Sequence, residues 1–263
     1  MQGLITGRHF LSFYHWFKVY VRSFYNHKSK ERQKIISLKE KHTLRVCQEI
    51  VNLGRKLNLK QEELFLAKTI GLFHDVGRFP QYEKYGTFRD AASENHALLG
   101  VKVLKKSHIL ENLPANVQNI ILKAIEYHNV RKLPDNLSDE VLFYSRLIRD
   151  ADKLDVLRVF INSYEHPTPA NKTIELELPD KEGYSTEIIN DILNNQISDL
   201  KLMQCKNDMK LMLLSWIFDI NFKPTFQVIK RRQYLEKILS FLPHTEDIRR
   251  IEKHLKNYLQ NSC

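Results

Sequence analysis

Histidine and aspartate residues recur in this chain at positions with apolar neighbours. The dipeptide His74-Asp75 closes the apolar stretch 66–77. An imidazole beside a carboxylate is costly to bury unless the charge is paired or coordinates a metal. Further residues of the same types lie on the apolar faces of expected helices: His42, His96, His128 and Asp152. Together these residues predict a metal site that is built from several helices.

The candidate ligands are numerous enough for one or two metal ions. One ion needs three or four nitrogen and oxygen ligands, and a larger set allows two ions that share a carboxylate. Imidazole and carboxylate suit the divalent ions of Mn, Fe, Co, Ni and Zn, and Mg is a further candidate. A single histidine on an apolar face is more often a hydrogen-bonded core residue, but the joint pattern favours metal binding.

Basic residues lie beside the candidate ligands. Arg78 follows the His-Asp pair at a helix end, and Lys153 directly follows Asp152. Basic groups next to a metal bind phosphoryl oxygens and stabilise the charge that develops during attack. Arg78 and Lys153 are therefore expected to bind phosphate, with Asp75 as the catalytic carboxylate.

The spacing of apolar residues predicts an all-α fold. Only eight glycines and eight prolines occur in 263 residues, which favours long helices. Helices are expected at residues 10–25, 29–57, 61–75, 91–106, 114–128 and 138–159, and later at 186–203, 206–220, 224–241 and 245–260. Residues 79–89 are expected to form a loop. Strict alternation from Thr173 to Leu178 predicts one short strand near 172–178.

The order of these residues resembles the HD-domain metal-dependent phosphohydrolase superfamily, over roughly residues 29–160. Its motif of His, then His-Asp, then Asp matches His42, His74-Asp75 and Asp152. The resemblance implies that these four residues hold one ion, and that a metal-activated water hydrolyses a phosphate ester or anhydride. His96 and His128 resemble the branch with a second metal, to which Asp75 would bridge.

The segment between two ligand-bearing helices is expected to border the site. Tyr82 and Tyr85 could stack on a base, and Gln81, Thr87 and Arg89 could form hydrogen bonds to it. Stacking on a base is worth ~1–3 kcal/mol, so a nucleotide-like small molecule is the expected substrate. The alternative is that these aromatic residues cap the helical core. Directly after His128, residues 129–134 contain no paired His, no Glu and no Gly-Tyr-Pro sequence, which argues against the cyclic dinucleotides of the HD-GYP branch.

A single HD-type domain is expected to span residues 1–263. It would comprise an N-terminal helix in 1–28, an HD core in 29–162, an irregular loop in 163–185 and a C-terminal helical extension in 186–263. Residues 10–25 are rich in aromatic side chains. They could bind a membrane surface or a partner, but packing on the domain's own core is favoured.

Two other functional classes fit parts of the sequence. The net charge of +10 is compatible with a nucleic-acid-binding protein, but no block of five like charges occurs. A nucleotide-binding regulator with the HD fold and little turnover is the other alternative, and the complete ligand set argues against it.

Three cysteines without a CxxC pattern favour a reducing compartment. No uncharged apolar run reaches the ~18 residues of a membrane span, so a cytoplasmic location is expected.

Overall fold

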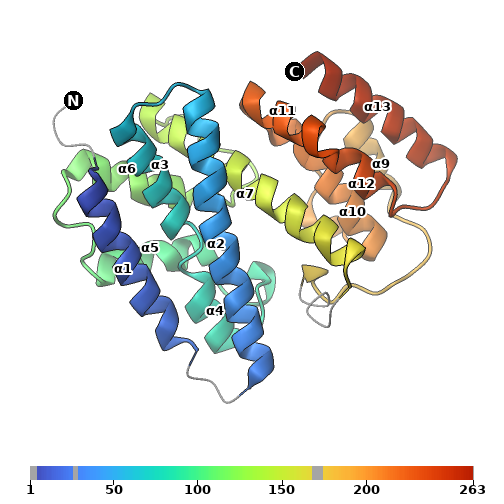
Figure 1. The fold of residues 1–263 in the computed structure, drawn as a ribbon. Coiled ribbons are helices and arrows are strands. Elements are labelled where there is room, and N and C mark those ends of the chain that lie inside the picture. Colours follow the sequence, from blue (N-terminus) through green and yellow to red (C-terminus); the bar gives the residue numbers. More distant parts are fainter. Residues whose placement is uncertain (1–4, 26–28, 168–173, 263) are drawn as a thin grey trace. The chain divides into compact units, whose positions relative to one another are not determined.

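The computed structural model describes residues 5–25, 29–167 and 174–262. These ranges contain helices and turns and no strand, which confirms the all-α prediction (Figure 1). The chain divides into two compact units, residues 1–155 and 156–263. The division falls inside the long helix α7 (Asp139–Glu165) and not in the expected loop 163–185. That one domain spans the whole chain stays a prediction.

In the described residues, the first unit contains six α-helices before α7. These are α1 (Gly7–Ser23), α2 (Lys30–Lys56), α3 (Gln61–Phe73), α4 (Arg78–Tyr85), α5 (His96–Lys106) and α6 (Ala115–Glu126). Helix α3 is its centre, because it packs against α1, α2 and α6 (Figure 1). Helix α4 packs against α2 and α5, and α5 packs against α6. These helices therefore pack together within one unit.

The aromatic helix α1 packs on its own unit. Phe13 and Phe17 are buried, and the rings of Phe13 and Trp16 each lie 5.7 Å from the ring of Phe73 on α3. Its aromatic face is thus used inside the unit, in agreement with the favoured interpretation.

The prediction of a loop at residues 79–89 is wrong for its first part, because α4 forms there. Pro80 lies in the first turn of this helix, where a missing backbone N–H is tolerated. The helix ends at Gly86, which has a left-handed φ of 68°. The next helix begins at His96 and not at Ala91, because the Asn95 side chain caps it by accepting from the N–H of Ala97 and Leu98. A short 3-10 helix, η1 (Asp90–Ala92), precedes it.

The short strand expected near 172–178 is absent from the described residues. Residues 172 and 173 lie outside them, and residues 175–177 form turns. Leu176 and Glu177 have φ values of 52° and 58°, which an extended strand excludes. Glu175 is buried and pairs with Lys206 at 3.1 Å. The alternation is therefore not accompanied by a strand in the described residues.

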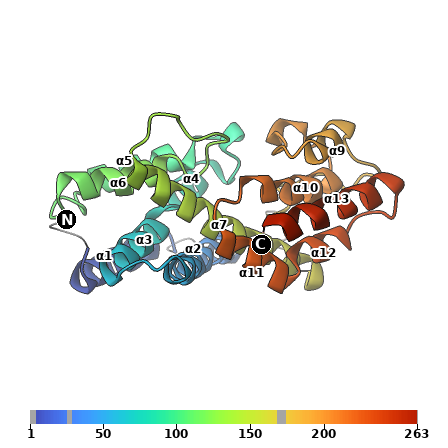
Figure 2. The same cartoon turned by 90° about the horizontal axis from the view of Figure 1, so that it is seen from above.

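The second unit is also helical (Figure 2). After the end of α7, its described elements are α9 (Thr186–Leu193), η2 (Leu200–Leu202), α10 (Lys206–Ser215), η3 (Trp216–Asp219), α11 (Lys223–Arg232), α12 (Tyr234–Leu239) and α13 (Glu246–Ser262). Helix α13 packs against α9, α11 and α12. The helix expected at 224–241 is split in two by Gln233, whose φ is 54°. Among the described helices, none combines the length and apolar character that crossing a bilayer requires.

Candidate metal centre

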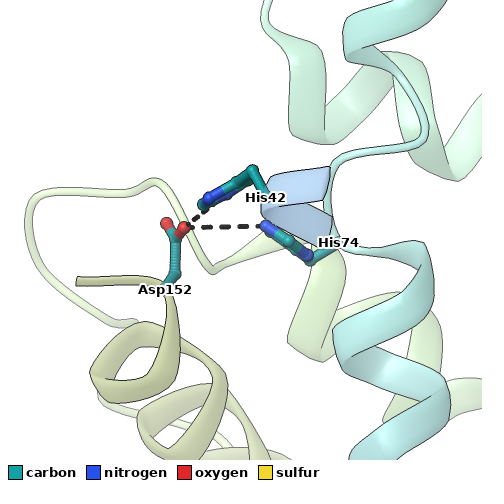
Figure 3. Close-up of side chains that lie close together, drawn as sticks. All are labelled: His42, His74 and Asp152. Atoms are coloured by element: carbon teal, nitrogen blue, oxygen red, sulfur yellow. Dashed lines mark ion pairs between the residues drawn. The ribbon is translucent and has the colours of Figure 1, made fainter. Parts of the chain in front are cut away.

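Three predicted ligands from three helices meet in a first group (Figure 3). His42 lies on α2, His74 is the C-cap residue of α3, and Asp152 lies on α7. The Nε2 atoms of His42 and His74 are 3.1 Å and 3.6 Å from Oδ1 of Asp152. The group therefore presents two imidazole nitrogens and one carboxylate oxygen to a common point.

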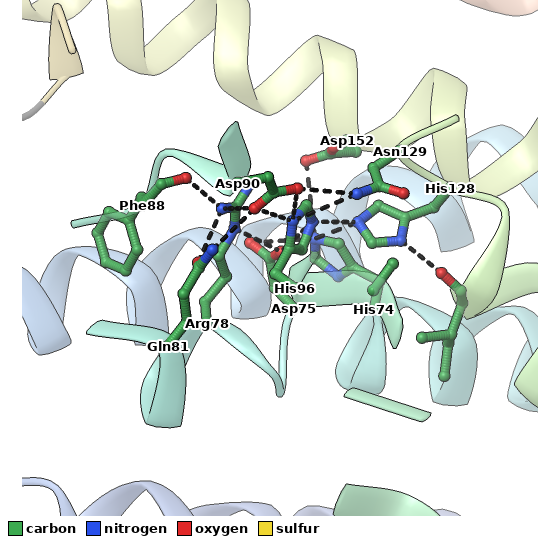
Figure 4. A network of polar contacts seen from close by, with 12 residues as sticks. His74, Asp75, Arg78, Gln81, Phe88, Asp90, His96, His128, Asn129 and Asp152 are labelled. Carbon is green, nitrogen blue, oxygen red and sulfur yellow. Dashed lines mark hydrogen bonds and ion pairs between the residues drawn. The ribbon is translucent and has the colours of Figure 1, made fainter. Parts of the chain in front are cut away.

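The other three predicted ligands, Asp75, His96 and His128, form a second group (Figure 4). The Nε2 atoms of His96 and His128 are 3.4 Å and 3.9 Å from Oδ1 of Asp75. These two Nε2 atoms lie 3.0 Å from each other. All three side chains are buried.

Asp75 joins the two groups through its two oxygens. Oδ1 faces the second group, whereas Oδ2 lies 3.5 Å from Nε2 of His42 and 3.6 Å from Nε2 of His74. The structure thus brings all six predicted ligands together, with Asp75 between the groups.

The apolar spacing in the sequence places these ligands within helices. In the structure, several of them lie at or just beyond helix ends. His128 follows the end of α6 at Glu126, and Asp75 lies in the turn between α3 and α4. Close packing at Gly77 brings this turn to α5. A Cβ atom at Gly77 would lie 2.1 Å from the carbonyl oxygen of His96 and 2.5 Å from the nitrogen of Gly100. Glycine is therefore required for Asp75 to approach His96.

Each of the four histidine rings is oriented by an oxygen at Nδ1. The partners are Asp155 for His42 (2.7 Å), the Gly71 carbonyl for His74 (2.8 Å), Asp90 for His96 (2.7 Å) and the Ile125 carbonyl for His128 (2.7 Å). A neutral ring that donates from Nδ1 carries its lone pair on Nε2. Metal-ligating histidines are held in this way, with the other ring nitrogen bonded to a carboxylate or a carbonyl.

The Nε2 atoms fit a divalent ion. Those of His42 and His74 are buried and have no hydrogen-bond partner, an arrangement that is costly for a polar atom. Two nitrogens ~2.1 Å from one ion and at right angles to each other would be ~3.0 Å apart. The Nε2 atoms of His96 and His128 have this separation.

The surroundings set the protonation states that metal ligands need. Burial, His96 and His74 lower the pKa of His128 to about 3. Burial acts to raise the pKa of Asp75, but Lys39, His74 and Arg78 hold it well below its usual range. His128 is thus neutral and Asp75 ionised at neutral pH.

The pKa of His42 is shifted in the opposite direction from the pKa values of His96 and His128. Burial and Lys39 act to lower the pKa of His42, but the nearby carboxylates of Asp152 and Asp155 raise it overall. The same carboxylates that attract a proton to this ring would attract a metal ion.

Two carboxylates that support ligand rings were not assigned from the sequence. Asp155 binds Arg45 through two hydrogen bonds of 2.8 Å and 3.0 Å, and Asp90 accepts from Nη1 of Arg78 at 2.9 Å. Asp155 follows Asp152 by one helical turn, a spacing that could have indicated its place. No comparable signal identifies Asp90, because its position depends on how residues 86–95 fold.

The predicted phosphate-binding residues lie beside the ligands. Nε of Arg78 is 3.5 Å from Oδ1 of Asp75, and its Nη1 also donates to Gln81 and to the carbonyl of Phe88 (Figure 4). Lys153 is buried and adjoins Asp152 on α7. Arg78 is thus held by several protein acceptors.

The residues expected to contact a base differ in exposure. Gln81 is buried, and its amide nitrogen donates to Asp90, Ser93 and the carbonyl of Glu94. Tyr82 is buried with its ring 4.9 Å from that of Phe88. Tyr85 and Arg89 are exposed.

Comparison with known proteins agrees with this geometry. The family model described as HD domain matches residues 40–157, a range that contains all six ligands. Neither the curated proteins nor the solved structures include a significant match. The resemblance inferred from the ligand order is confirmed. Residues 40–157 match an HD domain, which is consistent with the HD-domain superfamily of metal-dependent phosphohydrolases.

Proposed function

We propose that this protein is a metal-dependent phosphohydrolase that cleaves a phosphate ester or anhydride in a small, nucleotide-like molecule. One observation carries the proposal: Asp75 lies between two groups of buried ligands whose histidine Nε2 atoms all face inward. The HD domain match supports it, because an HD domain implies the superfamily of metal-dependent hydrolases.

Each group would hold one divalent ion. His42, His74, Asp75 and Asp152 would bind the first, and Asp75, His96 and His128 the second. Mn, Fe, Co, Ni and Zn suit these ligands, with Mg as a further candidate. Such ions lower the pKa of a water molecule and orient it for in-line attack on phosphorus.

The chain's own residues would bind and orient the substrate. Lys153 would hold the phosphate next to Asp152. Arg78 would add positive charge beside Asp75, and its contacts also give it a role in holding Asp90 and therefore His96. Tyr85 and Arg89 would contact the base, since they are the exposed members of that set. Gln81 and Tyr82 would hold the segment in place.

Metal analysis followed by a substrate screen tests the proposal. The purified protein would be analysed for bound metals and then assayed for phosphate release from nucleotides and from an aryl phosphate. Metal-dependent release, lost on chelation, is expected. Tight nucleotide binding without any release would support the regulatory alternative.

A further inference from the structure

Lys39 holds a positive charge at the edge of the metal centre. It lies on α2 one turn before His42, and its Nζ donates to Oδ2 of Asp75 at 2.8 Å. Its side chain is only 16% exposed. Nζ also lies 5.2 Å from the centre of the Phe88 ring, within the range of a cation–π contact. These contacts fix the ammonium group beside Asp75.

The ammonium and the first ion would share one oxygen atom. Oδ2 of Asp75 is the oxygen that lies 3.5 Å and 3.6 Å from the Nε2 atoms of His42 and His74. Two cations at one oxygen repel each other and divide its negative charge. Lys39 helps to keep Asp75 ionised when the site is empty, but once an ion is bound the two cations repel each other.

Once an ion is bound, the positive charge of Lys39 is no longer neutralised by the carboxylates around the site. Asp75 and Asp152 provide two negative charges, which one divalent ion would neutralise. The nearby Asp90 and Asp155 already pair with Arg78 and Arg45. Among the described residues, Asp75 is the acid with which Lys39 pairs. A largely buried ammonium needs an anionic partner, so the loaded site would require an anion there.

We propose that Lys39 is a phosphate-binding residue that contacts an oxygen of the substrate's phosphoryl group next to the first ion. This inference rests on the proposed function for its metal and names one further residue of the same site. Charge-assisted hydrogen bonds from an ammonium to a phosphate oxygen are among the stronger polar contacts. A role limited to positioning Asp75 is the rival explanation, and it predicts a different effect on the metal.

Equilibrium binding separates the two roles. Mn²⁺ binding to the wild-type, Lys39→Met and Lys39→Arg proteins would be measured by calorimetry, and inorganic phosphate would then be titrated into each Mn²⁺-loaded protein. Lys41→Met is the matched control, because Lys41 is exposed on the same helix. Lys39→Met should bind Mn²⁺ at least as tightly as the wild type and phosphate about 10-fold or more weakly. Lys39→Arg should regain most of the phosphate affinity, and Lys41→Met should resemble the wild type.

Two results would overturn the inference. One is a loss of Mn²⁺ affinity in Lys39→Met, which would make Lys39 a positioning residue for Asp75. The other is phosphate binding that is unchanged in Lys39→Met or absent from the loaded wild-type protein. Turnover is not part of this test, so a wild-type protein that binds phosphate through Lys39 but hydrolyses nothing would refute the proposed function and leave the inference standing.

Discussion

The Nε2 atoms of His96 and His128 face each other at 3.0 Å, although each ring already contacts an oxygen through Nδ1. Two lone pairs at this separation need a cation between them. The low pKa of His128 disfavours a proton in that place. A metal ion is the cation that best explains the pair.

His128→Ala should therefore remove one ion and keep the other. The first group does not include His128, so its ion should remain bound with little loss of affinity. Metal content by mass spectrometry, together with a calorimetric titration, would measure this. His108→Ala is the control, since His108 is exposed. Unchanged stoichiometry in His128→Ala would rule out the second ion site.

Gly77→Ala should weaken the second metal site although Gly77 is not a ligand. The added Cβ would meet backbone atoms of His96 and Gly100, and those atoms cannot move aside as a flexible side chain can. We expect a loss of about 1–3 kcal/mol in the free energy of unfolding and weaker binding of the second ion. Denaturant unfolding and metal titration would measure both. Gly100→Ala is the control, because its nearest contact would be an ordinary 3.4 Å; equal effects of the two substitutions would contradict the argument.

Asp90→Asn should weaken the second ion without removing any ligand. Asp90 accepts from Nδ1 of His96, and Arg78, Gln81 and Asn129 donate to the same carboxylate. Loss of a carboxylate that orients a ligating histidine typically costs about 10- to 100-fold in metal affinity. Asp135→Asn provides the control, since its carboxylate is exposed. Wild-type affinity in Asp90→Asn would show that this carboxylate does not orient the ligand.

Tyr85→Ala should lower activity on nucleotides more than on an aryl phosphate. Tyr85 is 37% exposed, and a stacked base contributes ~1–3 kcal/mol. Values of kcat/KM for both substrates would be compared, with Tyr14→Ala as a control because Tyr14 on α1 has a similar exposure of 36%. Equal losses on both substrates would mean that Tyr85 does not read the base.

The sequence predicts the ligands better than their local structure. Residue type and apolar surroundings are enough to select His42, His96 and Asp152, because a buried imidazole or carboxylate needs a partner wherever it lies. The place of His128 beyond the end of α6 is missed, since apolar spacing continues through a helix end. The contact between Lys39 and Asp75 joins residues that are 36 positions apart. It depends on how α2 packs beside the turn after α3, which no local pattern encodes.

Phosphate release by metal-loaded wild-type and Asp75→Ala proteins is the most direct test of the central claim. Asp75 places one oxygen near the histidines of each ligand group, so its loss should impair both ions and the orientation of the attacking water. The account predicts metal-dependent release by the wild type and none above background by Asp75→Ala. Release at a comparable rate by an Asp75→Ala protein of verified metal content would contradict it.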